Sequence, residues 1–110
     1  MGKGKSEENK KIIEGVRDFK QVSKKNIGIE KIIIFGSAAR GDMSEHSDVD
    51  LILVSKKFSQ KSFLKRSLGL RKYWKLGYPA DFICYTPEEF EREKKKVSIV
   101  SEALREGIVV

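Results

Sequence analysis

Two aspartates in this 110-residue chain have the type and spacing to act together. Asp48 and Asp50 stand two residues apart at the entrance to an apolar run, so on a strand both side chains project from one face, with α-carbons about 6.7 Å apart. Carboxylates ~4 Å apart repel by about 4 kcal/mol at an effective dielectric near 20 unless a cation lies between them. Such hard oxygen ligands suit Mg²⁺. The alternative is an exposed strand entrance where both acids are solvated.

A glycine and a hydroxyl residue lie upstream of this pair. Gly36 and Ser37 follow an apolar strand and open a short helical turn. This junction offers free backbone N–H groups, a hydroxyl donor and room for a phosphate to come close. Asp81 is a third acid among apolar residues, at the start of a later strand. Together these residues indicate a phosphate cradle beside clustered carboxylates for a divalent metal.

The elements that must position these residues follow from the apolar pattern. Apolar runs rich in β-branched residues predict three strands, over 29–35, 49–54 and 80–85. Three-and-four spacing predicts helices over 12–27, 57–76 and 87–106, the last with a bend near Lys96. Residues 108–110 add a short edge strand. Residues 1–11 read as a flexible basic tail, which leaves 12–110 as one domain.

Composition and charge limit the classes of protein that this chain can be. Its 23 Lys plus Arg against 16 Asp plus Glu give a net charge of +7. The length suits one domain and excludes a two-domain enzyme. No apolar run approaches the ~20 residues of a membrane-spanning helix, so we expect no membrane partner and a cytoplasmic location. Cys84 is the single cysteine, which excludes an intrachain disulfide.

The motifs together resemble the minimal nucleotidyltransferases of the DNA polymerase β superfamily. The likeness spans about residues 29–85. Its specificity comes from the presence of both Gly36-Ser37 and the Asp48-x-Asp50 pair, since either one by itself is a weak signal. These motifs are Gly36-Ser37, Ala39-Arg40-Gly41, Ser47-Asp48-Val49-Asp50-Leu51 and the later Asp81.

The resemblance implies transfer of a nucleoside monophosphate, with AMP the favoured group, from a nucleoside triphosphate to an acceptor hydroxyl, with release of pyrophosphate. It assigns Asp48, Asp50 and Asp81 to catalysis and Mg²⁺ binding, and Gly36 and Ser37 to phosphate binding. Arg40 either contacts phosphate or braces the loop.

If the site residues converge, the topology follows from their places on the strands. The phosphate-binding residues end the first strand and Asp48 and Asp50 begin the second, so these strands run antiparallel. Asp81 begins the third strand, which therefore runs parallel to the second, with 57–76 as the crossover. We expect an α/β (α+β) nucleotidyltransferase fold, a small mixed sheet of three main strands flanked by helices.

The chain leaves no residues for a domain that grips the acceptor. The resemblance implies a helical partner protein or a second copy that completes the pocket, as in toxin and antitoxin pairs. One alternative is therefore a non-catalytic, antitoxin-like subunit that binds its partner. The segment 55–75 holds eight Lys or Arg and no acid. This basic helix could meet nucleic acid or an acidic partner, or form a solvated exterior. A nucleic-acid-binding module is thus the weaker alternative.

Overall fold

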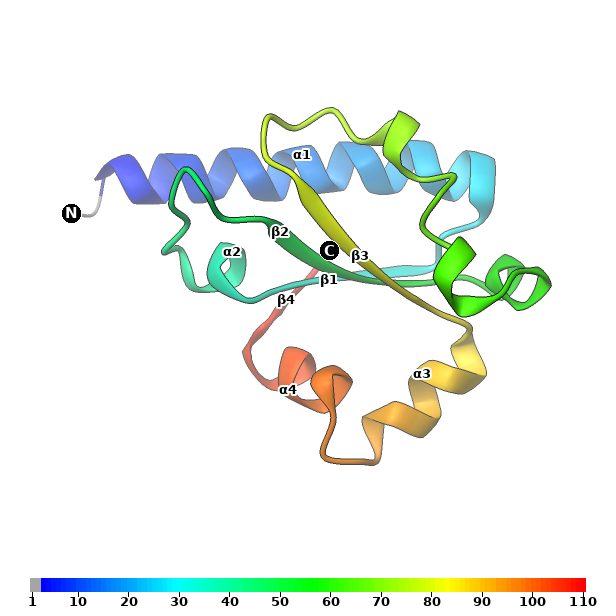
Figure 1. The fold of residues 1–110 in the computed structure, drawn as a ribbon. Coiled ribbons are helices and arrows are strands. Elements are labelled where there is room, and N and C mark those ends of the chain that lie inside the picture. Colours follow the sequence, from blue (N-terminus) through cyan, green and yellow to red (C-terminus); the bar gives the residue numbers. More distant parts are fainter. Residues whose placement is uncertain (1–2) are drawn as a thin grey trace.

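A computed structural model describes the chain over residues 3–110, with side chains from Glu7 onward. Its centre is a four-stranded sheet of order β3-β2-β1-β4 (Figure 1). The strands are β1 (Lys31–Phe35), β2 (Val49–Val54), β3 (Ala80–Tyr85) and β4 (Ile108–Val109). β1 runs antiparallel to β2 and β4, whereas β2 runs parallel to β3. The mixed sheet and the edge strand predicted from the sequence are confirmed.

Helices cover both faces of this sheet (Figure 1). α1 (Lys3–Ile27) lies on one face, and α3 (Pro87–Lys94) and α4 (Ile99–Glu106) lie on the other. In β1, Ile32 and Ile34 pack in the core beneath α1, and Ile33 packs in the core beneath α3 and α4. Burial on both faces explains why β1 and β2 read as nearly continuous apolar runs.

The first helix is longer than the sequence predicts. It begins at Lys3 rather than at Ile12, so residues 3–11 extend α1 instead of forming a separate tail. Met1 and Gly2 of the predicted tail lie outside the described residues. Glu8 accepts a hydrogen bond from the hydroxyl of Tyr78, a tertiary contact that supports this early part of the helix.

The predicted helix over 57–76 is wrong. Three short 3₁₀ helices replace it: η1 (Lys56–Gln60), η2 (Phe63–Lys65) and η3 (Arg71–Tyr73). Serines at 55, 59, 62 and 67 offer the backbone competing hydrogen bonds, and Gly69 weakens a helix further. Within this segment Leu70 is buried and Trp74 half-buried, but Phe63 is 51% exposed.

The bend expected near Lys96 is a full break between two helices. A capping box at Thr86 starts α3, as predicted, and a second one at Ser98 starts α4. Val97 is fully exposed in the break. Nowhere along residues 3–110 is there a helix of the length and apolarity needed to cross a bilayer.

Candidate active site

The turn after β1 forms the first wall of the candidate site. Gly36 adopts φ +70° and ψ −149°, a backbone conformation that favours glycine, and α2 (Ser37–Arg40) follows directly. A β-carbon at Gly36 would collide with the carboxylate of Asp50. The turn therefore needs glycine for two reasons: its backbone angles and its close approach to an acid of the next strand.

Strand register brings two of the predicted acids together. Phe35 of β1 pairs with Asp50 of β2, and Asp50 pairs with Asp81 of β3. Directly paired residues of neighbouring strands project from the same face of a sheet. Asp50 shares its face with Ile52 and Val54, so the two carboxylates lie at the end of the face that α3 and α4 cover. Asp48 immediately precedes β2.

The electrostatics of this cluster are unfavourable without a cation. Burial raises the pKa of the Asp50 carboxyl, and the negative charges of Asp81 and Asp48 raise it further, against a smaller lowering by Arg40. Over residues 7–110 no hydrogen bond or ion pair to any of these three carboxylates is found. Asp50 is half-buried, whereas Asp48 and Asp81 are exposed. Arg40 therefore offsets only part of the cost of charging Asp50.

The three acids are not gathered into a ready ligand set. Within the described part of the chain, no three His, Cys, Asp or Glu side chains form a group that could hold a metal ion as they stand. Their chemistry nevertheless suits a divalent cation, since carboxylate oxygens are its preferred ligands and the charge of Asp50 is only partly offset by Arg40. Ligands that repel one another lie closest when a cation joins them.

The loop residues around α2 have contacts of their own. The Ser37 hydroxyl donates to the Met43 sulfur at 3.3 Å, and Arg40 Nε pairs with Asp42 at 3.4 Å. The Arg40 side chain is 56% exposed, so this weak pair leaves it free to turn toward a ligand. The Ser47 hydroxyl accepts a hydrogen bond from the Ser44 amide at 3.0 Å, which assigns it to bracing the loop before Asp48.

One set of supporting contacts could not be predicted from the sequence. Tyr78 precedes β3 by two residues; its hydroxyl donates to Glu8 of α1, and its carbonyl accepts from Trp74 Nε1 at 2.7 Å. The next carbonyl, Pro79 O, accepts from the Val49 amide at 2.8 Å. These bonds fix the approach to Asp81 from two sides.

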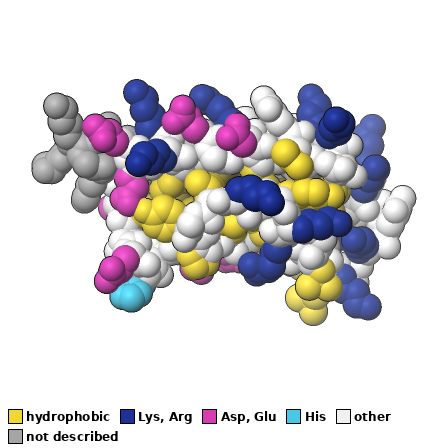
Figure 2. Space-filling model, turned by 90° about the horizontal axis from the view of Figure 1, so that it is seen from above, with side chains coloured by type: hydrophobic (Ala, Val, Ile, Leu, Met, Phe, Trp, Pro, Cys, Tyr) yellow, Lys and Arg dark blue, Asp and Glu magenta, His cyan; other side chains and the backbone are white. Residues whose placement is uncertain are grey.

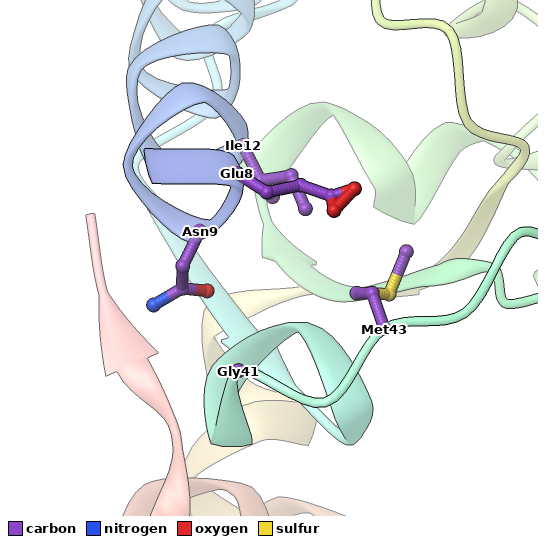
Figure 3. A pocket seen from close by; sticks show the side chains of 5 residues that line it. All are labelled: Glu8, Asn9, Ile12, Gly41 and Met43. Carbon is purple, nitrogen blue, oxygen red and sulfur yellow. The ribbon is translucent and has the colours of Figure 1, made fainter. Parts of the chain in front are cut away.

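Residues 8–12 of α1 also lie beside the loop after α2. Figure 3 shows Glu8, Asn9 and Ile12 beside Gly41 and Met43 around a cavity of about 10 Å³. Asn9 Oδ1 is buried here and has no hydrogen-bond partner among the residues described. Residues 8–12 thus lie beside both the segment before β3 and the loop after α2.

Comparison with known proteins identifies the class to which this fold and site belong. The sequence profile of the nucleotidyltransferase domain family matches residues 10–110. The crystal structure of a provisionally named nucleotidyltransferase from Sulfolobus solfataricus superposes with a TM-score of 0.69 at 21% identity, covering 99% of this chain and 87% of that one. That likeness shows a shared fold.

Two similar proteins of Methanocaldococcus jannaschii carry the provisional name protein adenylyltransferase. One is 28% identical over 101 residues, 90% of this chain and 98% of that protein. The other is 51% identical over 47 residues, which span 43% of this chain and 45% of that protein. The chain belongs to the nucleotidyltransferase domain family and is a transferase. The predicted resemblance is confirmed.

Proposed function

We propose that this protein transfers AMP from ATP to a hydroxyl group on a protein or another macromolecule, in a reaction that needs Mg²⁺ and releases pyrophosphate. The observation that carries the proposal is the pairing of Asp50 with Asp81 beside the Gly36 turn, with the pKa of Asp50 raised by burial and by the charges of Asp81 and Asp48. The name shared by the two M. jannaschii relatives supports adenylyl as the transferred group.

Asp48, Asp50 and Asp81 are the residues that would hold divalent metal. The family generally uses such a metal, which when bound supplies positive charge against the triphosphate and lowers the pKa of the attacking hydroxyl. The negative charges of both other acids act on Asp50, since each raises its pKa. Asp81 lies on the outer strand β3 and is exposed, so it can reach an acceptor that arrives from solution.

The turn at Gly36 would hold the phosphates of the nucleotide. Its glycine leaves room for an anion, and the Ser37 hydroxyl can exchange the weak acceptor Met43 Sδ for a phosphate oxygen. Arg40 can do the same with its exposed pair to Asp42, because phosphate offers a stronger, bidentate partner. These residues orient the triphosphate so that its α-phosphate faces the carboxylates.

The surface of the segment 56–76 supports a macromolecular partner. No acid occurs between Leu51 and Ala80, and Phe63, Leu64 and Leu68 are 51%, 86% and 71% exposed. Figure 2 shows Lys and Arg side chains gathered at the end of this face away from the N-terminus, next to exposed hydrophobic ones. Exposed apolar side chains rimmed by charge mark interaction sites. A partner bound here, whether acidic protein or nucleic acid, could bring the acceptor hydroxyl.

Label transfer tests the proposal directly. The protein is incubated with ATP, CTP, GTP or UTP labelled at the α-phosphate, with Mg²⁺ and extract of the source cells. The expected result is label from ATP on a macromolecule, lost when Mg²⁺ is chelated. No labelled product with any of the four nucleotides would contradict the proposal. An antitoxin-like subunit acting by binding alone predicts that Asp48→Asn plus Asp50→Asn leaves partner binding unchanged and that no label is transferred.

A further inference from the structure

A cavity of about 230 Å³ lies beside the phosphate-binding turn, on the side of α4. Phe35, Gly36 and Arg40 line one wall. The other wall is one face of α4, made of residues at i, i+3, i+4 and i+7: Ile99, Glu102, Ala103 and Glu106. The sequence assigns no role to any of these four residues.

The cavity adjoins the candidate active site. Phe35 pairs with Asp50 across β1 and β2, and Gly36 is in close contact range of the same carboxylate. A molecule in the cavity would therefore contact Phe35, the residue paired with Asp50, and Gly36, which lies against the Asp50 carboxylate. A volume of about 230 Å³ is smaller than the 300–1,000 Å³ typical of pockets that enclose whole ligands. It suits part of a nucleotide, with the remainder outside.

The charges on the two walls differ in sign, so a ligand with one anionic end would bind in one orientation. On the first wall, the guanidinium of Arg40 attracts phosphate. Glu102 and Glu106, one turn apart on the facing helix, repel it. Glu102 is 65% exposed and its only ion pair among the described residues is a 4.0 Å contact with Arg105, so its carboxylate remains able to accept hydrogen bonds.

The lining of the α4 wall matches a nucleoside. Carboxylates accept hydrogen bonds from neutral donors such as ribose hydroxyls and the exocyclic amine of adenine. Phe35 supplies an aromatic side chain and Ile99, 41% exposed, an aliphatic one, between which a base can pack. Ala103 is small and leaves the space between the two glutamates open.

We propose that this cavity binds the nucleoside part of the substrate, with Glu102 and Glu106 accepting hydrogen bonds from its neutral N–H and O–H donors. The inference rests on the proposed function, since it places the nucleoside of the same triphosphate that Gly36 and Ser37 hold. In this arrangement α4 orients the nucleotide. Its two glutamates repel the phosphates toward the turn and accept hydrogen bonds from the nucleoside.

Calorimetric binding of two probes tests the inference without any acceptor. The probes are α,β-methylene-ATP, which has a nucleoside, and inorganic tripolyphosphate, which has none, each with Mg²⁺. Glu102→Ala plus Glu106→Ala should weaken the binding of the ATP analogue about five- to tenfold. The same variant should bind tripolyphosphate as well as the wild type does, or more tightly, because repulsion is removed. Glu14→Ala, an exposed acid on α1, is the matched control and should change neither affinity.

Two further nucleotides separate the donors. Binding of 2′-deoxy-ATP tests the ribose hydroxyl, and purine riboside triphosphate, which lacks the amine, tests the base. Whichever donor is used, the wild type should prefer ATP over the analogue that lacks it, and the double variant should lose that preference.

Each way of failing has its own signature. Equal affinity of wild type and double variant for the ATP analogue would overturn the nucleoside site and leave the phosphate site standing. So would wild-type protein that binds tripolyphosphate as tightly as the ATP analogue. A wild type that binds neither probe would overturn the proposed function together with this inference.

Discussion

Two clusters of charge lie at opposite ends of the parallel pair β2 and β3. One is an ion pair of opposite charges, and the other gathers acids. Near the end of β3, Arg66 is only 7% exposed and grips Glu89 with two hydrogen bonds of 2.5 and 3.1 Å. The same guanidinium donates to the carbonyls of Cys84 and Lys61. The bond to Arg66 holds the pKa of Glu89 below its usual range.

At the start of β2 and β3 three acids lie near one another, and Arg40 offsets only part of their charge. Burial, followed by the charges of Asp81 and Asp48, raises the pKa of Asp50. The paired cluster joins the segment before β3 to α3 and so stabilises the fold, whereas the acidic cluster costs stability. An arrangement of acids that costs stability is typical of a functional site, because a bound cation would supply the missing charge.

The largest effect should come from removing charge at the acidic end. Asp48→Asn plus Asp50→Asn should reduce label transfer by at least about a thousandfold, because under the proposed function both residues hold the metal that neutralises the triphosphate. Circular dichroism should show an unchanged fold. Glu45→Gln, an exposed acid in the same loop, should retain full activity. Activity of the double variant within tenfold of wild type would contradict the role of the pair.

Breaking the paired cluster should instead affect stability. Arg66→Ala leaves Glu89 without its partner and two carbonyls without a donor, which should cost about 3 kcal/mol of unfolding free energy. Urea denaturation measures this loss. Lys65→Ala, an exposed neighbour, should change stability by less than about 0.5 kcal/mol. Equal losses in the two variants would show that the ion pair is not a main support.

Neutralising Asp50 alone should stabilise the protein when no metal is present. A raised pKa in the folded state means that ionisation of Asp50 opposes folding, so Asp50→Asn should raise Tm by roughly 2–4 °C at pH 7. The gain should fall toward zero as the pH drops through the folded-state pKa toward 3.8, where the wild-type carboxyl is protonated as well. Melting curves from pH 3 to 8 measure it. A lower Tm at pH 7 would contradict an unfavourable charge on Asp50.

The smallest effect concerns the support behind Asp81. The hydrogen bond to Glu8 is the largest cause of the raised pKa of Tyr78. Tyr78→Phe removes that bond and should lower Tm by about 1–2 °C near neutral pH. Since the folded-state pKa lies above 10.0, the difference should disappear as the pH rises through it. Tyr73→Phe is the control and should leave Tm unchanged.

The sheet and the acids could be predicted because their signals are local. Ile32 to Ile34 and Leu51 to Leu53 are apolar on both faces, which only a covered strand explains. Acids at the starts of two such strands, after a Gly-Ser turn, indicate a functional site, and this inference does not depend on the structure of the segment between the two strands. The roles assigned to these acids remain predictions.

What the sequence could not supply depends on contacts between distant residues. Arg66 meets Glu89, 23 residues further along, and this anchor replaces the helical stripe that was expected over 57–76. Glu8 meets Tyr78 across 70 residues, which no local pattern reveals. Glu102 and Glu106 read as ordinary solvent-facing acids of an amphipathic helix, and only the fold sets them opposite Gly36.

Binding of Mn²⁺, followed by electron paramagnetic resonance, tests most directly whether the three acids share a metal with the nucleotide. With α,β-methylene-ATP present, the wild type should bind Mn²⁺, and Asp50→Asn and Asp81→Asn should each weaken this binding at least tenfold. If both variants bind Mn²⁺ with wild-type affinity in the presence of the nucleotide, the carboxylates at the start of β2 and β3 do not form the metal site.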